Sequence, residues 1–182
     1  GLIIPPVRLI RQSRLEVDVL HLILANVRTP EERFGDLLAQ IAANGRGAER
    51  LADLIARYGK SEVADSMKVL QAYSERMTRS LLGSLPDGRY TFEDWMDDDG
   101  IGDEPVAIRV AVEIQGDQAI VDFTGSSEQC KGSINAVNAI TLSAVYYVFR
   151  CLLGLDVPNN AGCLAPIRVV APPGSIVNAL HP

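Results

Sequence analysis

The chain has 182 residues, of which 47% are hydrophobic and 22% are charged, a composition typical of a globular protein with one sizeable domain or two small ones. A formal net charge of −6 with scattered basic residues argues against nucleic acid as a partner, because that interface needs clustered lysine and arginine. The apolar runs are shorter than the roughly 18–20 residues needed to cross a bilayer, so no membrane segment is expected. Three cysteines without CxxC spacing, Cys130, Cys151 and Cys163, predict reduced thiols in a cytoplasmic protein, as small buried side chains rather than catalytic groups.

The N-terminal half predicts helices after a short extended segment. Residues 2–9 are apolar around Pro5-Pro6, which favours extended backbone. Ser13 is a candidate N-cap, with Glu16 three residues later, for a helix that reaches about residue 27.

A second, long helix is predicted between clear start and stop signals. Thr29 is a candidate N-cap, Pro30 suits the first helical position, and Gly59 follows the last expected helical residue, Tyr58. Apolar residues recur at helical spacing and predict one buried stripe: Phe34, Leu38, Ile41, Ala48, Ala52 and Ile55. Ser61 is expected to cap a third helix that ends near residue 82, with a core face of Val63, Met67, Leu70, Tyr73, Met77 and Leu81.

Asp36, Gln40 and Asn44 lie at i, i+4 and i+8 of the second helix and therefore form one polar row. Amide side chains in such a row favour defined hydrogen bonds. The row predicts either hydrogen bonding between helices or subunits, or one wall of a pocket.

The C-terminal half predicts short strands and one helix. Strands are expected at residues 89–96, 106–114, 118–124, 166–171 and 175–178, and the second and third of these form a hairpin. The acidic stretch at residues 97–104 lacks the ligand spacing of a calcium loop and is expected to be a solvated loop. Another loop is expected at residues 155–162.

The fold class is therefore α+β, with a long-helix half at residues 1–84 and a β-hairpin-rich half at residues 85–182 that contains one buried helix. Because the chain begins on GLIIPPVRL without a methionine and stops on NALHP, we expect a piece of a longer polypeptide.

Residues 119–154 contain the candidate site. A strand leads into a loop at residues 125–135 that is rich in Gly, Ser and Asn, and an apolar helix is expected from about residue 137 to residue 153. A polar loop before a helix either binds a small anion or polar ligand at the free helical N–H groups or is a plain connection. The spacings of a P-loop, GxxxxGK[ST], and of a nucleophile elbow, GxSxG, are absent, so the residues alone predict no reaction.

Several stretches carry a resemblance to one protein family. They are GLIIPPVRL, NVRTPEERFGDLLAQIAANGRGAERL, LDVPNNAG with PIRVVAPPGSIVN, and VDFTGSSEQCKGSINAVNAITLSAVYYVFRCLL. Over nearly its whole length the chain resembles the B-type subunit of hydantoinases, also found as part of 5-oxoprolinases and related to a subunit of acetone-type carboxylases.

The resemblance implies a larger protein that acts with an A-type partner which binds ATP. Family members open N-substituted hydantoins or 5-oxoproline in ATP-dependent ring cleavage, and carboxylase relatives activate a ketone and add bicarbonate. In the implied mechanism the A-type part phosphorylates the carbonyl oxygen and the B-type part processes the activated intermediate. The family's His/Asp metal motif precedes GLIIPP, so ATP and a divalent metal are implied for the full complex, no metal ligand is assigned here, and the chain alone is expected to be inactive.

These expectations lead to a set of candidate site residues, although catalytic residues stay unassigned. Five side chains around the loop and helix start are expected to contact the substrate: Thr124, Ser126, Asn135, Asn138 and Thr141. The polar row of Asp36, Gln40 and Asn44 is expected to support a helix interface in an oligomer. The alternatives are a non-catalytic module that docks the A-type subunit or its own copies, a segment of a ketone carboxylase, and an unrelated α+β binding domain.

Overall fold

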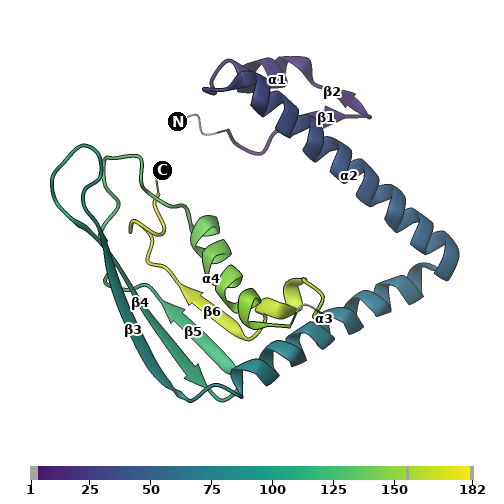
Figure 1. Ribbon diagram of the computed structural model, residues 1–182. Helices are drawn as coiled ribbons and strands as arrows, with labels where there is room; N and C mark the ends of the chain where they lie inside the picture. Colours follow the sequence, from purple (N-terminus) through teal and green to yellow (C-terminus); the bar gives the residue numbers. More distant parts are fainter. Residues whose placement is uncertain (1–3, 155, 181–182) are drawn as a thin grey trace. The chain divides into compact units, whose positions relative to one another are not determined.

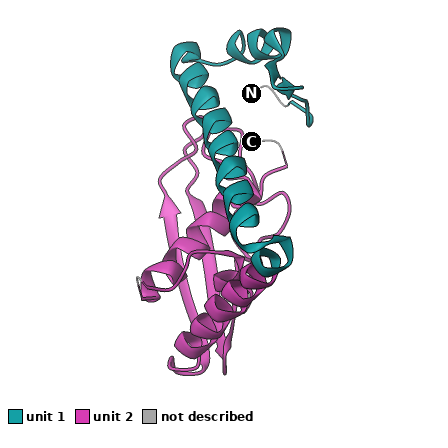
Figure 2. Ribbon diagram, turned by 90° about the vertical axis from the view of Figure 1, so that its right-hand side faces the viewer, with its two compact units in different colours: residues 1–64 teal, residues 65–182 magenta. Residues whose placement is uncertain are grey.

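The computed structural model describes residues 4–154 and 156–180. Residues 2, 3 and 155, expected in the first extended segment and in a loop, lie outside the described residues. Helices dominate the first part of the chain and a sheet dominates the second, which confirms the α+β class (Figure 1). The chain divides into two compact units, residues 1–64 and residues 65–182 (Figure 2). A domain boundary between residues 84 and 85 stays a prediction.

Unit 1 begins with a small hairpin that replaces the predicted helix cap. Strands β1 (Ile10–Arg11) and β2 (Arg14–Leu15) pair antiparallel. Gln12 and Ser13 between them adopt φ of 49° and 62°, the left-handed backbone that a two-residue hairpin loop requires. The prediction of Ser13 as an N-cap was therefore wrong, and α1 spans only Val17–Leu24.

Helix α2 has the predicted bounds but not the predicted burial. It spans Pro30–Tyr58, with Thr29 at the N-cap position and Gly59 after the end at φ 85°. No residue of α2 is buried in the described chain, and Phe34 and Leu38 on the expected core stripe are 38% and 43% exposed. The expectation of a buried stripe was wrong, because the eight-residue α1 is too short to cover a 29-residue helix.

Helix α3 spans Lys60–Leu82 and starts one residue before its expected cap, Ser61. The expected apolar core face was wrong at Met67, Leu70 and Met77, which are 46%, 49% and 36% exposed, whereas Leu81 near the end of the helix packs against a buried cluster. The buried residues are instead Ser74, Thr78 and Leu82.

The buried polar face of α3 receives the turn that contains the 3-10 helix η1 (Ala161–Leu164). The Ser74 hydroxyl donates to the carbonyl of Pro158 at 2.9 Å, and a Cβ added to Gly162 would lie 1.9 Å from the carbonyl oxygen of Gln71. The backbones therefore approach closely, which small side chains permit and a stripe of large apolar residues would prevent.

The sheet of unit 2 has the order β3 (Gly88–Met96), β4 (Val106–Gln115), β5 (Gln118–Asp122) and β6 (Ile167–Val170). The first three strands are antiparallel, and Gly116 at φ 56° turns the chain between β4 and β5 as predicted. Because β5 and β6 are parallel, the chain must cross over between them, and helix α4 (Asn138–Leu152) makes that connection (Figure 1). The strand expected at residues 175–178 is absent: the N–H of Gly174 and the carbonyl of Asn178 close a turn there at 2.8 Å.

The main core lies between α4 and one face of the sheet. It contains Val145 and Phe149 of α4 with Leu82 of α3 and sheet residues such as Val121. The helix was expected to be buried on most of its surface, but it buries only the line of Thr141, Val145 and Phe149, while Tyr147 and Val148 are 71% and 57% exposed. Within the described residues, no helix combines the length and apolar character needed to cross a membrane.

Candidate functional site

The loop between β5 and α4 is held against the start of β4 by two serines. The Ser126 hydroxyl accepts from the N–H of Arg109 at 3.0 Å and donates to its carbonyl at 3.1 Å. The Ser127 hydroxyl accepts from the N–H of Ala107 at 2.9 Å, and the N–H of Ser127 donates to the Ala107 carbonyl at 2.9 Å. Side-chain oxygens thus continue the hydrogen bonding of β4 after β5 has ended.

The C-terminal segment forms the other wall of this loop. The N–H of Ile176 donates to Ser127 at 2.9 Å, and the N–H of Ala136 donates back to Ile176 at 2.8 Å. The buried side chains of Ile176 and Val177 pack with Val106 beneath the loop. Residues 126–136 are therefore hydrogen-bonded to β4 on one side and to the C-terminal segment on the other.

Within the loop, one amide and one carboxylate fix the backbone. Asn135 accepts from the N–H of Cys130 at 2.9 Å and donates to the carbonyls of Cys130 and Gly132 at 2.8 and 3.1 Å. Asp99, from the acidic loop, accepts from the N–H of Gly132 at 3.0 Å. A Cβ at Gly132 would lie 1.7 Å from the backbone oxygen of Asp99, so only glycine fits this contact.

Asp99 in the acidic loop and Asp122 at the end of β5 are two carboxylates whose ionised forms the structure favours. Hydrogen bonds from the N–H groups of Gly102, Ile101 and Gly132 lower the pKa of Asp99 below its ordinary value of 3.8. The hydroxyl and then the N–H of Thr124 lower the pKa of Asp122 in the same way. Both carboxylates act as hydrogen-bond acceptors for the loop backbone, and sequence reasoning missed Asp99 in this role. Its partner Gly132 lies 33 residues away, and the run of aspartates alone did not single out Asp99.

The five predicted contact residues lie in one region of the structure, but most of their side chains form hydrogen bonds with other residues of the chain. The Thr124 hydroxyl donates to Asp122 at 2.6 Å, and the buried Thr141 hydroxyl donates to the carbonyl of Val177 at 2.5 Å. Ser126 and Asn135 make the bonds given above. Asn138 is exposed at the first residue of α4 and forms no side-chain hydrogen bond with another described residue. Contact of these side chains with a substrate stays a prediction.

The polar row of α2 is exposed to solvent. Asp36 forms an ion pair with Arg33 at 2.9 Å, while Gln40 and Asn44 have exposed side chains. The row lies in unit 1, and its predicted role at an interface stays a prediction.

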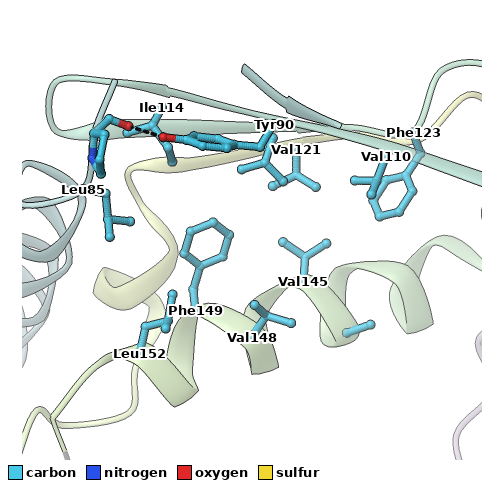
Figure 3. A pocket seen from close by; sticks show the side chains of 13 residues that line it. Leu85, Tyr90, Val110, Ile114, Val121, Phe123, Val145, Val148, Phe149 and Leu152 are labelled. Atoms are coloured by element: carbon cyan, nitrogen blue, oxygen red, sulfur yellow. Dashed lines mark hydrogen bonds between the residues drawn. The ribbon is translucent and has the colours of Figure 1, made fainter. Parts of the chain in front are cut away.

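A large apolar groove lies between α4 and the sheet, with a volume of about 660 Å³. Figure 3 shows Tyr90, Val110 and Val121 of the sheet facing Val148 and Leu152 of α4 across it. The phenol of Tyr90 donates to the carbonyl of Pro86 at 2.9 Å. The lining carries no carboxylate, imidazole, thiol or amine among the described residues, so the groove can hold apolar groups, and the Tyr90 phenol is the ionisable group that it presents.

The donor set of the described residues does not fit a resident metal ion. Among residues 4–154 and 156–180, no three His, Cys, Asp or Glu side chains come together as a metal site would require. We therefore derive no step through a metal in this chain.

Comparison with known proteins identifies the family. The model of the family described as Hydantoinase B/oxoprolinase matches residues 1–182. 5-oxoprolinase 1 of Arabidopsis thaliana is 35% identical over 169 residues, which are 85% of this chain and 13% of that protein.

Two solved structures share the fold. The crystal structure of ATP-dependent caprolactamase from Pseudomonas jessenii superposes with a TM-score of 0.86 at 34% identity, covering 100% of this chain and 31% of that one. Acetone carboxylase in its nucleotide-free structure also gives a TM-score of 0.86, at 18% identity over 98% of this chain and 25% of that chain, which shows the fold alone.

The chain is shorter than the proteins it matches. It spans 32%, 11% and 13% of the length of three curated relatives. Over its full length, the chain belongs to the hydantoinase B/oxoprolinase family.

Proposed function

We propose that these residues act as part of the B-type subunit of an ATP-dependent enzyme that opens a cyclic amide of the hydantoin or 5-oxoproline type. The observation that carries the proposal is the agreement in fold and sequence, over 100% of this chain and 31% of the other, with an ATP-dependent caprolactamase, an enzyme whose name indicates a lactam. The family match over residues 1–182 supports the same reaction class.

In this proposal, an A-type subunit binds ATP and activates the ring carbonyl, and a divalent metal comes from outside these residues. The segment between β5 and α4, together with the first turns of α4, contributes the wall of the substrate site through Thr124, Ser126, Asn135, Asn138 and Thr141. The internal hydrogen bonds of four of these residues support a role in shaping the loop, and the exposed Asn138 amide is the group among them that is free for a ligand. Three free cysteines, with Cys163 buried, support a reducing compartment such as the cytoplasm.

The test is an activity assay of the full-length subunit with its A-type partner. ATP hydrolysis and ring-opened product are measured with 5-oxoproline, hydantoin and caprolactam, and carboxylation is measured with acetone and bicarbonate. We expect ATP-dependent opening of at least one ring, with no product when either subunit is omitted. Carboxylation of acetone without ring opening would move the protein to the carboxylase class.

The exposure of α2 favours a second candidate, a module that docks the A-type subunit. Leu38 and Ile55 lie on one apolar stripe of α2 and are 43% and 36% exposed. Leu38→Glu and Ile55→Glu are expected to dissociate the two subunits in analytical ultracentrifugation, whereas Arg46→Gln on an exposed position is not. Unchanged association in both apolar variants would contradict docking through α2, and loss of self-association alone would indicate contact between copies.

A further inference from the structure

Strand β3 forms a free edge of the sheet in unit 2. It is nine residues long and pairs with β4 on one side, and among the described residues no strand pairs with its other side (Figure 1). All of its residues except Met96 are exposed, whereas the strand at the opposite edge, β6, has only four residues. A long, exposed edge strand offers a row of unpaired backbone groups, so β3 is the edge at which another strand can extend the sheet.

The hydrogen bonds of β4 show which backbone groups of β3 are free. Arg109 of β4 directs its N–H away from β3, to the hydroxyl of Ser126 at 3.0 Å. Because hydrogen bonding alternates along antiparallel strands, the next residue, Val110, bonds to β3, where its partner in the register is Phe92. The backbone groups that point to the open edge therefore belong to the odd-numbered residues of β3, of which three lie near the middle of the strand: Arg89, Thr91 and Glu93.

The sequence of this edge is complementary to itself. Two copies of β3 that pair antiparallel about Thr91 place Arg89 of each copy opposite Glu93 of the other. Each outward-pointing residue then exchanges both of its backbone hydrogen bonds with the second copy. Centring the pairing two residues earlier or later, on Arg89 or on Glu93, would instead place like charges opposite each other, which destabilises a pair of strands. Charge therefore selects the register that is centred on Thr91.

The side chains of Arg89 and Glu93 are available for this pairing. Arg89 is exposed and attracts the Asp122 carboxylate, but it forms no ion pair with any described residue. Glu93 accepts from Arg109 through its Oε2 atom, which leaves the Oε1 atom for the guanidinium of a second copy. An ion pair between the copies therefore forms twice without breaking one inside either copy.

The same register joins two aromatic residues on the other face of the sheet. Tyr90 lines the apolar groove below α4 (Figure 3), and Phe92 lies on the same face because it follows two residues later. Centring on Thr91 places Tyr90 of each copy opposite Phe92 of the other, in pairs without backbone hydrogen bonds, where side chains approach most closely. The two rings are 49% and 68% exposed in one copy, so the pairing removes apolar surface from water.

We infer that two copies of the protein pair through the free edge of β3, with a twofold axis at Thr91, and join their four-stranded sheets into one. Arg89 and Glu93 set the register on one face, and Tyr90 and Phe92 pack across it on the other. Because the contact is one strand wide, we expect a dimer with a Kd on the order of micromolar that dissociates on dilution. The inference concerns assembly and does not depend on the proposed reaction.

The test measures self-association of the full-length subunit by sedimentation velocity over a range of concentrations. Arg89→Glu leaves two acidic positions on the edge and Glu93→Arg leaves two basic ones. Each variant alone would place like charges opposite each other twice, so we expect its dimerisation to be at least about tenfold weaker than that of the wild type. An equimolar mixture of the two variants restores opposite charges in both pairs and is expected to associate more tightly than either variant does with itself.

Arg168→Glu is the matched control. It reverses an exposed charge in the row of cross-strand partners that starts at Arg89, but it lies on β6 at the opposite edge and should dimerise like the wild type. Thr91→Cys stays informative if a charge variant does not fold, because its two Cα atoms would lie about 5.5 Å apart across the twofold axis, a distance that permits a disulfide. We expect mild oxidation to link Thr91→Cys into covalent dimers to a greater extent than the wild type, with its three native cysteines, or Arg168→Cys.

Three results would overturn the inference. One is a wild type that stays monomeric at all concentrations, and another is a dimer that neither charge variant weakens. A mixture of Arg89→Glu and Glu93→Arg that does not associate, although circular dichroism shows both variants to be folded, would exclude the register centred on Thr91. Charge variants that lose the A-type subunit but still self-associate would likewise overturn it, because the edge would then pair with a strand of that subunit.

Discussion

Gly162→Ala tests whether the turn after α4 depends on close contact with α3. The new Cβ would lie 1.9 Å from the carbonyl oxygen and 2.8 Å from the carbonyl carbon of Gln71, distances that no backbone contact tolerates. Relief requires the turn to move away from α3, which breaks the hydrogen bonds of Ser74 with Pro158 and of Asn160 with Ser74. At about 1 kcal/mol for each bond, with further loss from the buried hydroxyl of Ser74, we expect unfolding to become easier by about 2–4 kcal/mol.

The measurement is urea unfolding followed by a signal from unit 2, such as the fluorescence of Trp95. Gly102→Ala is the matched control in the same unit, because its Cβ would meet the nearest atom, an oxygen of Asp99, at an ordinary 3.8 Å. We expect the control to differ from the wild type by less than about 0.5 kcal/mol. A Gly162→Ala chain as stable as the control would refute the contact between the turn and α3.

Three further substitutions test other parts of the chain. Thr141→Val leaves the carbonyl of Val177 without its hydroxyl donor and should destabilise unit 2 by about 1–3 kcal/mol in the same unfolding assay; no change would contradict that bond. Gly45→Ala, on an exposed position of α2 with nothing within 4 Å, should increase helix stability by about 1 kcal/mol, measured by thermal unfolding followed by circular dichroism. Because the folded-state pKa of Asp99 is lowered from 3.8, the stability that the Asp99 carboxylate contributes is complete above pH 3.8 and is lost as the pH falls through the lower folded value. Asp99→Asn should abolish that part of the acid dependence, which is measured as amide hydrogen exchange at Gly132. An unchanged pH profile would exclude this role of Asp99.

Element positions could be predicted from the sequence where a local signal determines them. Pro30 and Gly59 bound α2 because one residue suits the first helical turn and the other the residue after the last. The hairpin of β4 and β5 follows from alternation around Gly116. The same kind of reasoning failed at Ser13, since a capping pattern and a hairpin loop use similar residues and the pairing of β1 with β2 decides between them.

Burial could not be predicted from helical periodicity alone. The apolar stripe of α3 suggested a core face around Met67 and Leu70, yet the buried face begins at Ser74, where the turn at residues 157–164 packs. That contact joins residues 84 apart in sequence, and no local pattern encodes it. Likewise, the identity of Asp99 as a partner of Gly132 depends on how two loops meet.

The polar residues between β5 and α4 illustrate why composition alone overstates a binding site. Buried backbone groups need hydrogen-bond partners. Here the Asn135 side chain supplies them to the loop itself, while the side chains of Ser126 and Ser127 supply them to the neighbouring strand β4. Such residues determine the shape of the loop, so their substitution is expected to alter stability together with activity. Asn138 differs from them, because its exposed amide at the first residue of α4 forms no side-chain hydrogen bond with another described residue. Among the five predicted residues its amide is therefore the better candidate for direct contact with a substrate, and Asn138→Ala is expected to lower turnover without the loss of stability that substitution of Ser126 or Asn135 causes.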